Sequence, residues 1–242
     1  MTLALGDNYE SQLLQLLFNG TTIPSIAQNL ASGAVTTGGL ANLFVALHTA
    51  DPTTATSASQ QTNEVPTTSY TLYARQSVAR TSAGWTVTGT SVAPVNPIAF
   101  ATVPSGTASI TASTTSASAS LSITATTAGT LAVGQVVSGA GIPSGTYILS
   151  FGTYTTTAGT GTVTLSANAT ATASGVAMTT AGMSTTISAT YFSVGTASTG
   201  ASTILYKGAI SPAIPITGGV IPKLAPIATI SGSASLLRGS TS

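Results

Sequence analysis

Side chains that could perform acid–base, nucleophilic or metal chemistry are scarce in this sequence of 242 residues. Charged residues make up 4% of the chain, one histidine is present, and there is no cysteine. The absence of cysteine excludes disulfides, thiolate metal sites and cysteine nucleophiles. The charged residues and the histidine are Asp7, Glu10, His48, Asp51, Glu64, Arg75, Arg80, Lys207, Lys223 and Arg238.

His48 and Asp51 are the residues whose types come nearest to a catalytic group. A hydrolytic triad needs a histidine base, oriented by a carboxylate, beside a serine nucleophile. Asp51, however, lies three residues after His48 and directly before Pro52, where a carboxylate typically caps a chain reversal through the neighbouring backbone. We therefore expect structural roles for both residues.

Other kinds of chemistry are also not expected. Glycosidases need two carboxylates about 5–10 Å apart, and Asp51 and Glu64 are the only such pair near one loop. One histidine and four separated carboxylates do not give the ligand spacing of metal sites. With five lysines and arginines and a net charge of +1, the chain cannot neutralise a run of phosphates, so neither nucleic acid nor a membrane surface is an expected partner. We predict a protein that is not an enzyme and has no cofactor or metal.

Arg75 and Arg80 are separated by an odd number of positions, so on a regular strand they face opposite sides. We expect one of them to pair with Glu64 or Asp51 and the other to be solvated. A buried pair of an arginine and a carboxylate would fix the strand register in a protein with so few charges. The alternative is that these arginines contact an acidic patch on a partner protein.

One helix is predicted, at residues 7–20. Asp7 and Glu10 have the spacing of a capping box, and Gly20 supplies the end of the helix. Leu13, Leu14, Leu17 and Phe18 then fall on one face. This face either docks on the core of its own chain or packs on a neighbouring subunit, and we favour core docking.

Beyond residue 40 the pattern changes to the period of two that is typical of strands. Trp85 and Tyr73 are expected as core aromatics, with a carbohydrate-stacking platform as the alternative. The polar segment 52–69 is expected as a long exposed loop. The predicted fold class is therefore mainly β, with a β-sandwich or barrel core, one N-terminal helix and an inserted second small β-domain. Strands are expected at 43–48, 70–80, 84–90, 186–194 and 202–210, the last two flanking a hairpin loop at 195–200.

Residues 105–178 differ from the rest because they contain no charged residue. Glycine and proline divide short strands at intervals typical of a small sandwich or barrel. We expect this stretch to be an inserted β-module and residues 1–104 with 179–242 to form a discontinuous core domain. Uncharged strand edges are best tolerated where neighbours cover them, which favours assembly. The strands expected in the module are 121–125, 133–137, 146–151 and 161–165.

Three segments of the core domain resemble a family of tailed-bacteriophage virion proteins, described as capsid-associated or tail-fibre-like. Members share an L-x-V-A-L-H-T-A-D-P segment, a Y-A-R-x-x-V-A-R-T-x-x-G-W segment and an F-S-V-G-T-A-x-x-G segment, and a leucine-rich helix ending in Phe-Asn-Gly. Residues 129–148 are similar to a second phage pattern, G-T-L-x-V-G-Q-x-V-S-G-x-G-I-x-x-G-T. The matching stretches are LLQLLFNG (13–20), LFVALHTADP (43–52), YARQSVARTSAGWTV (73–87), FSVGTASTGASTILYKGAI (192–210) and GTLAVGQVVSGAGIPSGTYI (129–148).

The resemblance implies a structural protein of the virion, most simply a capsid decoration or cement protein that binds across joints of the major capsid protein lattice. The alternative is a tail-fibre or adhesive protein whose inserted module binds a host-surface glycan. By analogy the expected assembly is a homo-oligomer, with a trimer as the first hypothesis. No signal peptide is expected at the N-terminus, so assembly in the host cytoplasm is predicted. The residues expected at protein interfaces are Leu13, Leu17, Phe18, Arg75, Arg80 and Arg238.

Overall fold

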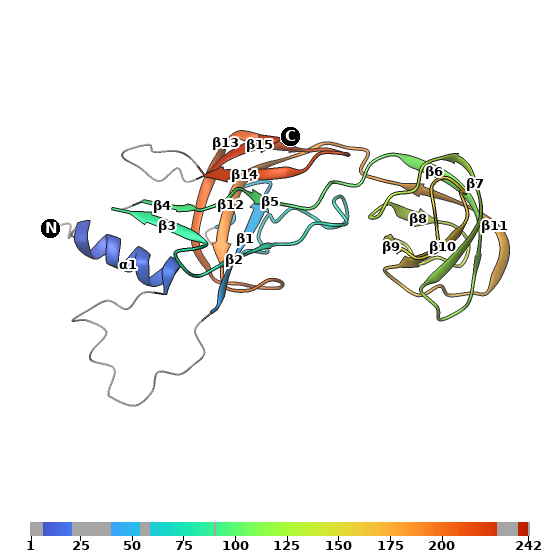
Figure 1. The fold of residues 1–242 in the computed structure, drawn as a ribbon, viewed down its shortest axis with the longest axis horizontal. Coiled ribbons are helices and arrows are strands. Elements are labelled where there is room, and N and C mark those ends of the chain that lie inside the picture. Colours follow the sequence, from blue (N-terminus) through green and yellow to red (C-terminus); the bar gives the residue numbers. More distant parts are fainter. Residues whose placement is uncertain (1–6, 21–39, 54–58, 90, 227–236, 242) are drawn as a thin grey trace, which may run out of the picture.

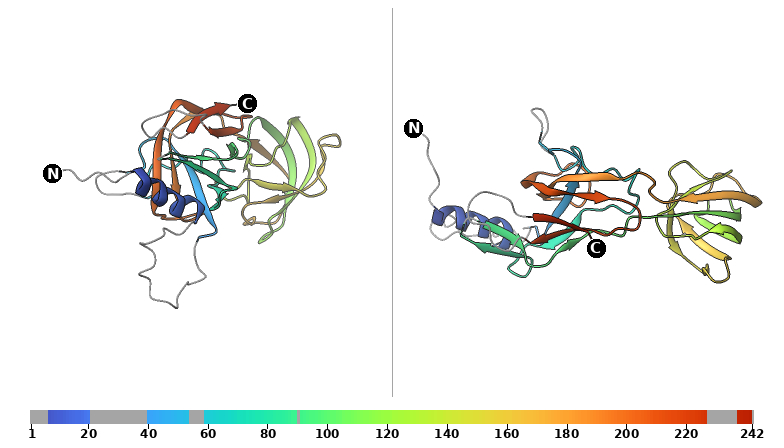
Figure 2. Two further views of the ribbon diagram at one scale, coloured as in Figure 1. Left: turned by 60° about the vertical axis from the view of Figure 1, so that its left-hand side comes forward. Right: turned by 90° about the horizontal axis from the view of Figure 1, so that it is seen from above.

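The structure is a computed structural model, and it describes all residues except 1–6, 21–39, 54–58, 90, 227–236 and 242. The fold is mainly β, as predicted, and α1 (Asp7–Asn19) is the one α-helix among the residues described. Two bodies of strands lie apart along the long axis of the molecule, with α1 at the end opposite the inserted module (Figure 1 and Figure 2).

The core domain contains a four-stranded antiparallel sheet with the order β13-β12-β1-β2. A second sheet has the order β15-β14-β5, and β3 forms a separate hairpin with β4. The strands of the first sheet are β1 (Asn42–His48), β2 (Gln76–Ala79), β12 (Ile187–Gly195) and β13 (Ile204–Ile216). The others are β3 (Trp85–Thr88), β4 (Ser91–Pro94), β5 (Ile98–Ala99), β14 (Pro222–Pro226) and β15 (Leu237–Thr241).

Large apolar side chains between these sheets form one buried cluster. Tyr73 and Trp85 belong to it, which confirms the prediction that both are core aromatics. On β1, both faces of the strand are mostly buried, as its two-sided apolar sequence predicts. The cluster draws its buried members from residues 18–103 and 189–224.

Helix α1 covers the β3–β4 hairpin at the edge of this cluster. Phe18 is 1% exposed, and its ring contacts the Trp85 ring edge-on at a centroid distance of 4.8 Å. Leu14 and Leu17 pack against the same cluster, whereas Leu13 is half-buried outside it. The C-terminal half of the helix therefore docks on its own chain. The side chains of the predicted capping pair, Asp7 and Glu10, lie outside the described residues.

Residues 105–178 contribute to a six-stranded sheet with the order β8-β11-β6-β7-β10-β9. A bridge between Val136 and Tyr147 and the bond from Ile148 N–H to the Gln135 carbonyl, at 3.0 Å, join its two ends. These contacts close the sheet into a barrel around a second buried cluster. Its strands are β6 (Thr107–Thr114), β7 (Ser120–Gly129), β8 (Val136–Ser138), β9 (Ile148–Phe151), β10 (Gly161–Leu165) and β11 (Ala173–Ala181).

Two predictions about the core-domain chain are wrong. The strand expected at 70–80 is limited to 76–79, because the chain turns at Tyr70–Tyr73 to bury both tyrosines, with Tyr73 N–H bonded to the Tyr70 carbonyl at 2.9 Å. The expected exposed loop at 52–69 buries Gln60 and Val65. Val65 N–H bonds to the Leu47 carbonyl at 3.0 Å, so the chain around Val65 pairs alongside the end of β1 instead of lying free.

The helix–hairpin contact gives a test of core docking. We expect Phe18→Ala to lower the free energy of unfolding by about 3–5 kcal/mol, because a buried aromatic ring and its contact with Trp85 are lost. Leu13→Ala, on the same helix but outside the buried cluster, should cost about 1 kcal/mol or less. Urea titrations of the two variants measure both values, and equal losses would contradict the docked arrangement.

Candidate functional site

A buried ion pair between Glu64 and Arg75 lies at the end of the core sheet. Arg75 Nε is 2.8 Å from Glu64 Oε1, and Arg75 Nη2 is 2.8 Å from Glu64 Oε2. The arginine side chain is 2% exposed and that of Glu64 is 17% exposed. This two-pronged geometry is the strong form of an arginine–carboxylate contact. Arg75 is therefore the arginine that forms the expected ion pair, and Glu64 is its partner.

The same pair holds two further segments in place. Arg75 also donates to the carbonyls of Ala197 and Gly200, at 3.0 and 2.8 Å, in the connection between β12 and β13. Tyr73 donates from its hydroxyl to Glu64 Oε1 at 3.1 Å and accepts from Leu47 N–H at 2.9 Å. Burial raises the pKa of Tyr73 well above its ordinary value, so the phenol stays protonated and can act as this donor.

A second polar cluster is buried beside the first, between β1 and β12. His48 Nδ1 is 2.9 Å from the Thr62 carbonyl, and His48 Nε2 is 2.7 Å from Ser193 Oγ. Because a carbonyl only accepts, these bonds place the proton on Nδ1 and make Nε2 the acceptor of the serine hydroxyl. Gln60 Nε2 in turn donates to Ser193 Oγ at 3.1 Å and to the Phe44 carbonyl at 2.9 Å.

His48 and Ser193 have the types of a base and a nucleophile, yet their surroundings differ from those of a hydrolytic site. Both side chains belong to residues that are 0% exposed, so no substrate reaches the serine in this arrangement. The group that orients the imidazole is the carbonyl of Thr62, whereas a triad uses a carboxylate. Burial lowers the pKa of His48 below its ordinary value of 6.5. The cluster therefore holds β1, β12 and the 60–62 segment together as neutral hydrogen-bonding groups.

Asp51 performs the turn-capping role expected for it and also forms an ion pair that the sequence did not indicate. Its Oδ1 accepts from Thr53 N–H at 2.8 Å, in the turn that follows β1. Lys207 Nζ on β13 lies 2.6 Å from Oδ1 and 2.7 Å from Oδ2, and it also contacts the Thr53 hydroxyl. Lys207 and the Thr53 donors lower the pKa of Asp51 to about 2.

Arg80 is half-buried, so the expectation that the second arginine is solvated is wrong. Its Nε donates to the Leu17 carbonyl at 2.7 Å and its Nη2 donates to the Leu16 carbonyl at 2.6 Å. The last carbonyls of a helix lack intrahelical partners and carry partial negative charge. Arg80 therefore caps the C-terminal end of α1 and fixes this helix to the end of β2.

The structure brings only some of the expected interface residues together. Leu17, Phe18 and Arg80 meet where α1 docks on the core domain, and Leu13 lies on the same helix. Arg75 belongs to the separate ion pair with Glu64. Arg238 lies on β15, at the register position opposite Ala225. The loop at 52–69 and the C-terminal tail at 225–242 are also expected to contact neighbours, and within them residues 54–58, 227–236 and 242 lie outside the described residues.

Sequence reasoning missed Gln60, Ser193 and Lys207. Ser193 is 145 positions from its partner His48, and Lys207 is 156 positions from Asp51, so no local spacing could have paired them. Gln60 lies in a polar stretch that resembles an exposed loop. The only signal was the low number of charges, which makes each charged residue a candidate for an internal bond.

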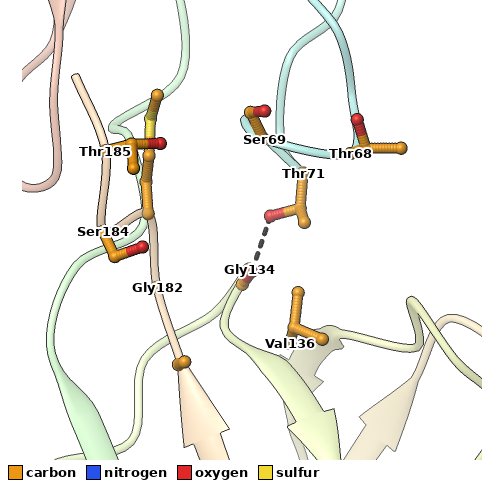
Figure 3. Close-up of a pocket in the computed structure, with 10 residues that line it drawn as sticks. Thr68, Ser69, Thr71, Gly134, Val136, Gly182, Ser184 and Thr185 are labelled. Carbon is orange, nitrogen blue, oxygen red and sulfur yellow. Dashed lines mark hydrogen bonds between the residues drawn. The ribbon is translucent and has the colours of Figure 1, made fainter. Parts of the chain in front are cut away.

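Two surface recesses formed by the described residues have no ionisable side chain in their linings. One, of about 160 Å³, lies where the barrel meets the core domain, and half of its lining residues carry hydroxyl groups, including Thr68, Ser69 and Ser184 (Figure 3). The other, of about 320 Å³, runs between β2 and residues 96–99. The chemistry of these linings is that of neutral hydrogen bonding and apolar contact.

Within the part of the chain that the structure describes, no three histidine, cysteine or carboxylate residues are grouped as metal ligands would be. No helix in this described part is long and apolar enough to cross a membrane. Comparison with protein-family models, with curated proteins and with solved structures found no match.

The two ion pairs differ in burial, and this difference gives a matched test. Arg75→Met leaves a buried carboxylate without its partner and should cost about 3–5 kcal/mol of unfolding free energy. Lys207→Met breaks the more exposed pair and should change the unfolding free energy much less, because water screens that pair. Adding Glu64→Gln to Arg75→Met should recover part of the loss, because the unpaired charge is removed. Denaturant titrations at pH 7 measure the loss of unfolding free energy in each variant. Similar losses for Arg75→Met and Lys207→Met would refute the prediction.

The buried imidazole predicts a pH dependence of stability. The unfolded chain binds a proton at His48 near pH 6.5, whereas the folded chain, with its lower pKa, does so only at lower pH. The free energy of unfolding should therefore decrease as the pH falls below about 6.5, with a slope of up to about 1.4 kcal/mol per pH unit.

His48→Gln should abolish this slope between pH 7 and 5, since His48 is the one histidine of the chain. Ser193→Ala is the control, because it removes a hydrogen bond but keeps the buried imidazole, so the slope should persist. Thermal or urea unfolding measured across this pH range provides the comparison. A wild-type slope in His48→Gln would show that His48 is not its source.

Proposed function

We propose that this protein is a structural component of a tailed-bacteriophage virion, and specifically a capsid decoration or cement protein that binds across joints of the major capsid protein lattice. The observation that carries the proposal is the position of the segments that resemble phage virion proteins. Residues 43–52, 73–87 and 192–210 contain β2, most of β1 and β3, and parts of β12 and β13. Of these strands, β1, β2, β12 and β13 are neighbours in one sheet.

Side chains from these segments bond to one another. Arg75 reaches the carbonyls of 197 and 200, Asp51 pairs with Lys207, and His48 bonds to Ser193. Each contact joins one resembling segment to another, so the segments pack together as one structural unit. This gives a physical reason for their occurrence together in one chain. These contacts support a fold shared with the phage proteins more directly than three separate short sequence matches would.

Many of the charged side chains of the core domain are bonded within the chain, which favours binding by surface shape over binding by charge. Glu64, Arg75, Asp51, Lys207 and Arg80 all have partners within the chain. The barrel adds a second surface with no charged residue in 105–178. A surface of this kind binds through apolar contact, hydroxyl groups and backbone, which are individually weak. Repetition of the contact over a symmetric shell makes such attachment stable through avidity.

The shape of the molecule supports an assignment of its two ends. Helix α1 and the β3–β4 hairpin lie at one end and the barrel at the other (Figure 2). Leu13 and Leu16 remain half-buried on α1 after docking of its other face. In the proposal, the α1 end contacts the major capsid protein and the barrel projects from the shell. A homo-oligomer, with a trimer as the first hypothesis, places several α1 ends around one lattice joint.

A second candidate function is supported by one surface feature of the barrel. Leu149 and Phe151 on β9 are 47% and 36% exposed, and the Phe151 ring contacts the Tyr154 ring at a centroid distance of 5.1 Å. An exposed aromatic ring among hydroxyl side chains is suited to stacking on a sugar. In this alternative the protein is a tail-fibre or adhesive protein of the same particle and binds a host-surface glycan.

Copy number distinguishes the two functions. Quantitative mass spectrometry of purified particles gives the ratio of this protein to the major capsid protein. Decoration predicts on the order of hundreds of copies per particle, because each lattice joint repeats the site. About a dozen copies or fewer would refute decoration and favour the tail-fibre alternative.

Paired variants locate the attachment surface. We expect Leu13→Ser with Leu16→Ser to reduce occupancy on particles at least several-fold, whereas Leu149→Ser with Phe151→Ser leaves occupancy unchanged. The second pair is the matched control, because it removes equally apolar side chains from the other end of the molecule. Loss of occupancy in the barrel variant alone would place the attachment site on β9 and contradict the assignment of the two ends.

A further inference from the structure

The barrel is joined to the core domain by two chain segments that bond to each other. Met183 N–H donates to the Pro104 carbonyl at 2.8 Å, and Gly182 N–H donates to the Gly106 carbonyl at 2.8 Å. These bonds continue the pairing of β6 with β11, whose last register pair is Thr107 with Ala181. The two connections thus form a ribbon of two strands. A lone ribbon of this kind is marginal by itself and does not fix the orientation of what it carries.

A second attachment exists away from this ribbon, in the turn at 133–135 that precedes β8. Thr71 donates from its hydroxyl to the Gly134 carbonyl at 2.5 Å, between the core domain and the barrel (Figure 3). Gly134 has a φ of +86°, and a Cβ placed there would collide with Pro104 Cγ and lie 2.7 Å from Leu72 Cγ. The turn therefore sits directly against core-domain side chains, at a distance that only glycine allows.

Gln135 fixes this turn within the barrel and also ties it to the ribbon. The residue is 0% exposed. Its Nε2 donates to the Ser105 carbonyl at 2.8 Å and to the Thr130 carbonyl at 3.1 Å. Its Oε1 accepts from the Thr180 hydroxyl at 2.7 Å and from Ala132 N–H at 3.1 Å. A shift of the turn would break bonds that are shielded from water, which is costly.

We propose that the 133–135 turn clamps the barrel to the core domain, so that the two bodies hold one relative orientation in solution. The ribbon and the clamp are separate points of attachment, and the hydroxyl-lined recess between them has walls from both bodies. Two points of attachment oppose a rotation of the barrel against the core domain that a single point would permit. The 133–135 turn lies within 129–148, the stretch with the repeated glycine pattern, so in this proposal the pattern has a role at the junction as well as inside the barrel.

The clamp has a consequence that rests on the proposed function. On a capsid lattice, rigidly attached barrels would all project in one direction relative to the shell. Their outer surfaces would then form a regular array. The clamp itself does not depend on that function and is tested on the isolated chain.

The test is a measurement of distances between one spin label on each body. Because the chain has no cysteine, Ser77→Cys on β2 and Ser174→Cys on β11 allow specific labelling at two exposed positions. We expect a single narrow distance distribution in this labelled parent. Gly134→Val should at least double its width, because the new side chain meets Pro104 and Leu72.

Gly145→Val is the matched control. Gly145 lies in the same barrel with a φ of +76°, and a Cβ placed there would have no other atom within 4 Å, so the variant carries equal backbone strain without the clash. Its distribution should stay narrow. A second variant, Thr71→Val with Leu72→Ala, removes the core-domain side of the clamp and leaves the barrel sequence intact, and it should also broaden the distribution. A broad distribution in the parent, or a narrow one in both clamp variants, would overturn the proposal.

Discussion

The buried pair of Glu64 and Arg75 is the contact on which the core domain depends. Burying two charges is costly, and the cost is offset only when geometry and additional hydrogen bonds are good. Here the carboxylate accepts from Arg75 and Tyr73, and the guanidinium also donates to two carbonyls between β12 and β13. The full set of bonds around this pair can form only when the segments around residues 64, 75 and 197–200 are all in place. It therefore selects one arrangement of these strands among the many that a sequence rich in threonine and alanine could adopt.

The two bodies are stabilised in different ways. The core domain combines large aromatic side chains with a few charged groups that join distant segments. The buried cluster of the barrel consists of alanine and aliphatic side chains with one methionine and one tyrosine, and residues 105–178 carry no charge. Its closure lets β8 and the start of β9 bond to each other instead of remaining edges. Side-chain hydroxyls such as those of Thr114 and Thr126 bond to carbonyls within it, so its polar groups are satisfied without ion pairs.

These features bear on how such a protein can act. Among the residues described, His48, Glu64, Arg75 and Arg80 are partly or fully buried and bonded within the core domain. In the proposed function, recognition rests on shape, on apolar side chains such as those left on α1 and β9, and on hydroxyl groups. A binding mode of this kind gains strength from repetition, and the proposed place in a virion supplies that repetition.

The sequence by itself determined the class of the fold and the elements with a strong local pattern. The helix at 7–19, the buried strand at 42–48 and the strand at 161–165 follow from apolar spacing and from glycine at the ends. The barrel strands β6 and β11 were missed, because alanine and threonine alternate there with too little difference in hydrophobicity to reveal a period. The local pattern also predicted a strand longer than β2, because Tyr70 and Tyr73 lie in a turn that buries both side chains in the core.

Only the tertiary structure decided which polar groups meet. The pairing of Arg75 with Glu64 was one of four combinations open from the sequence, because either Arg75 or Arg80 could pair with Glu64 or Asp51. The bonds of Arg80 to the end of α1, of Asp51 to Lys207 and of His48 to Ser193 had no local signal, since they join residues that are 63 to 156 positions apart. Periodicity reports which face of an element is buried, because burial follows from that element's own side chains. The partner of a buried polar group depends instead on which strands become neighbours, and long-range packing of the whole sheet determines this.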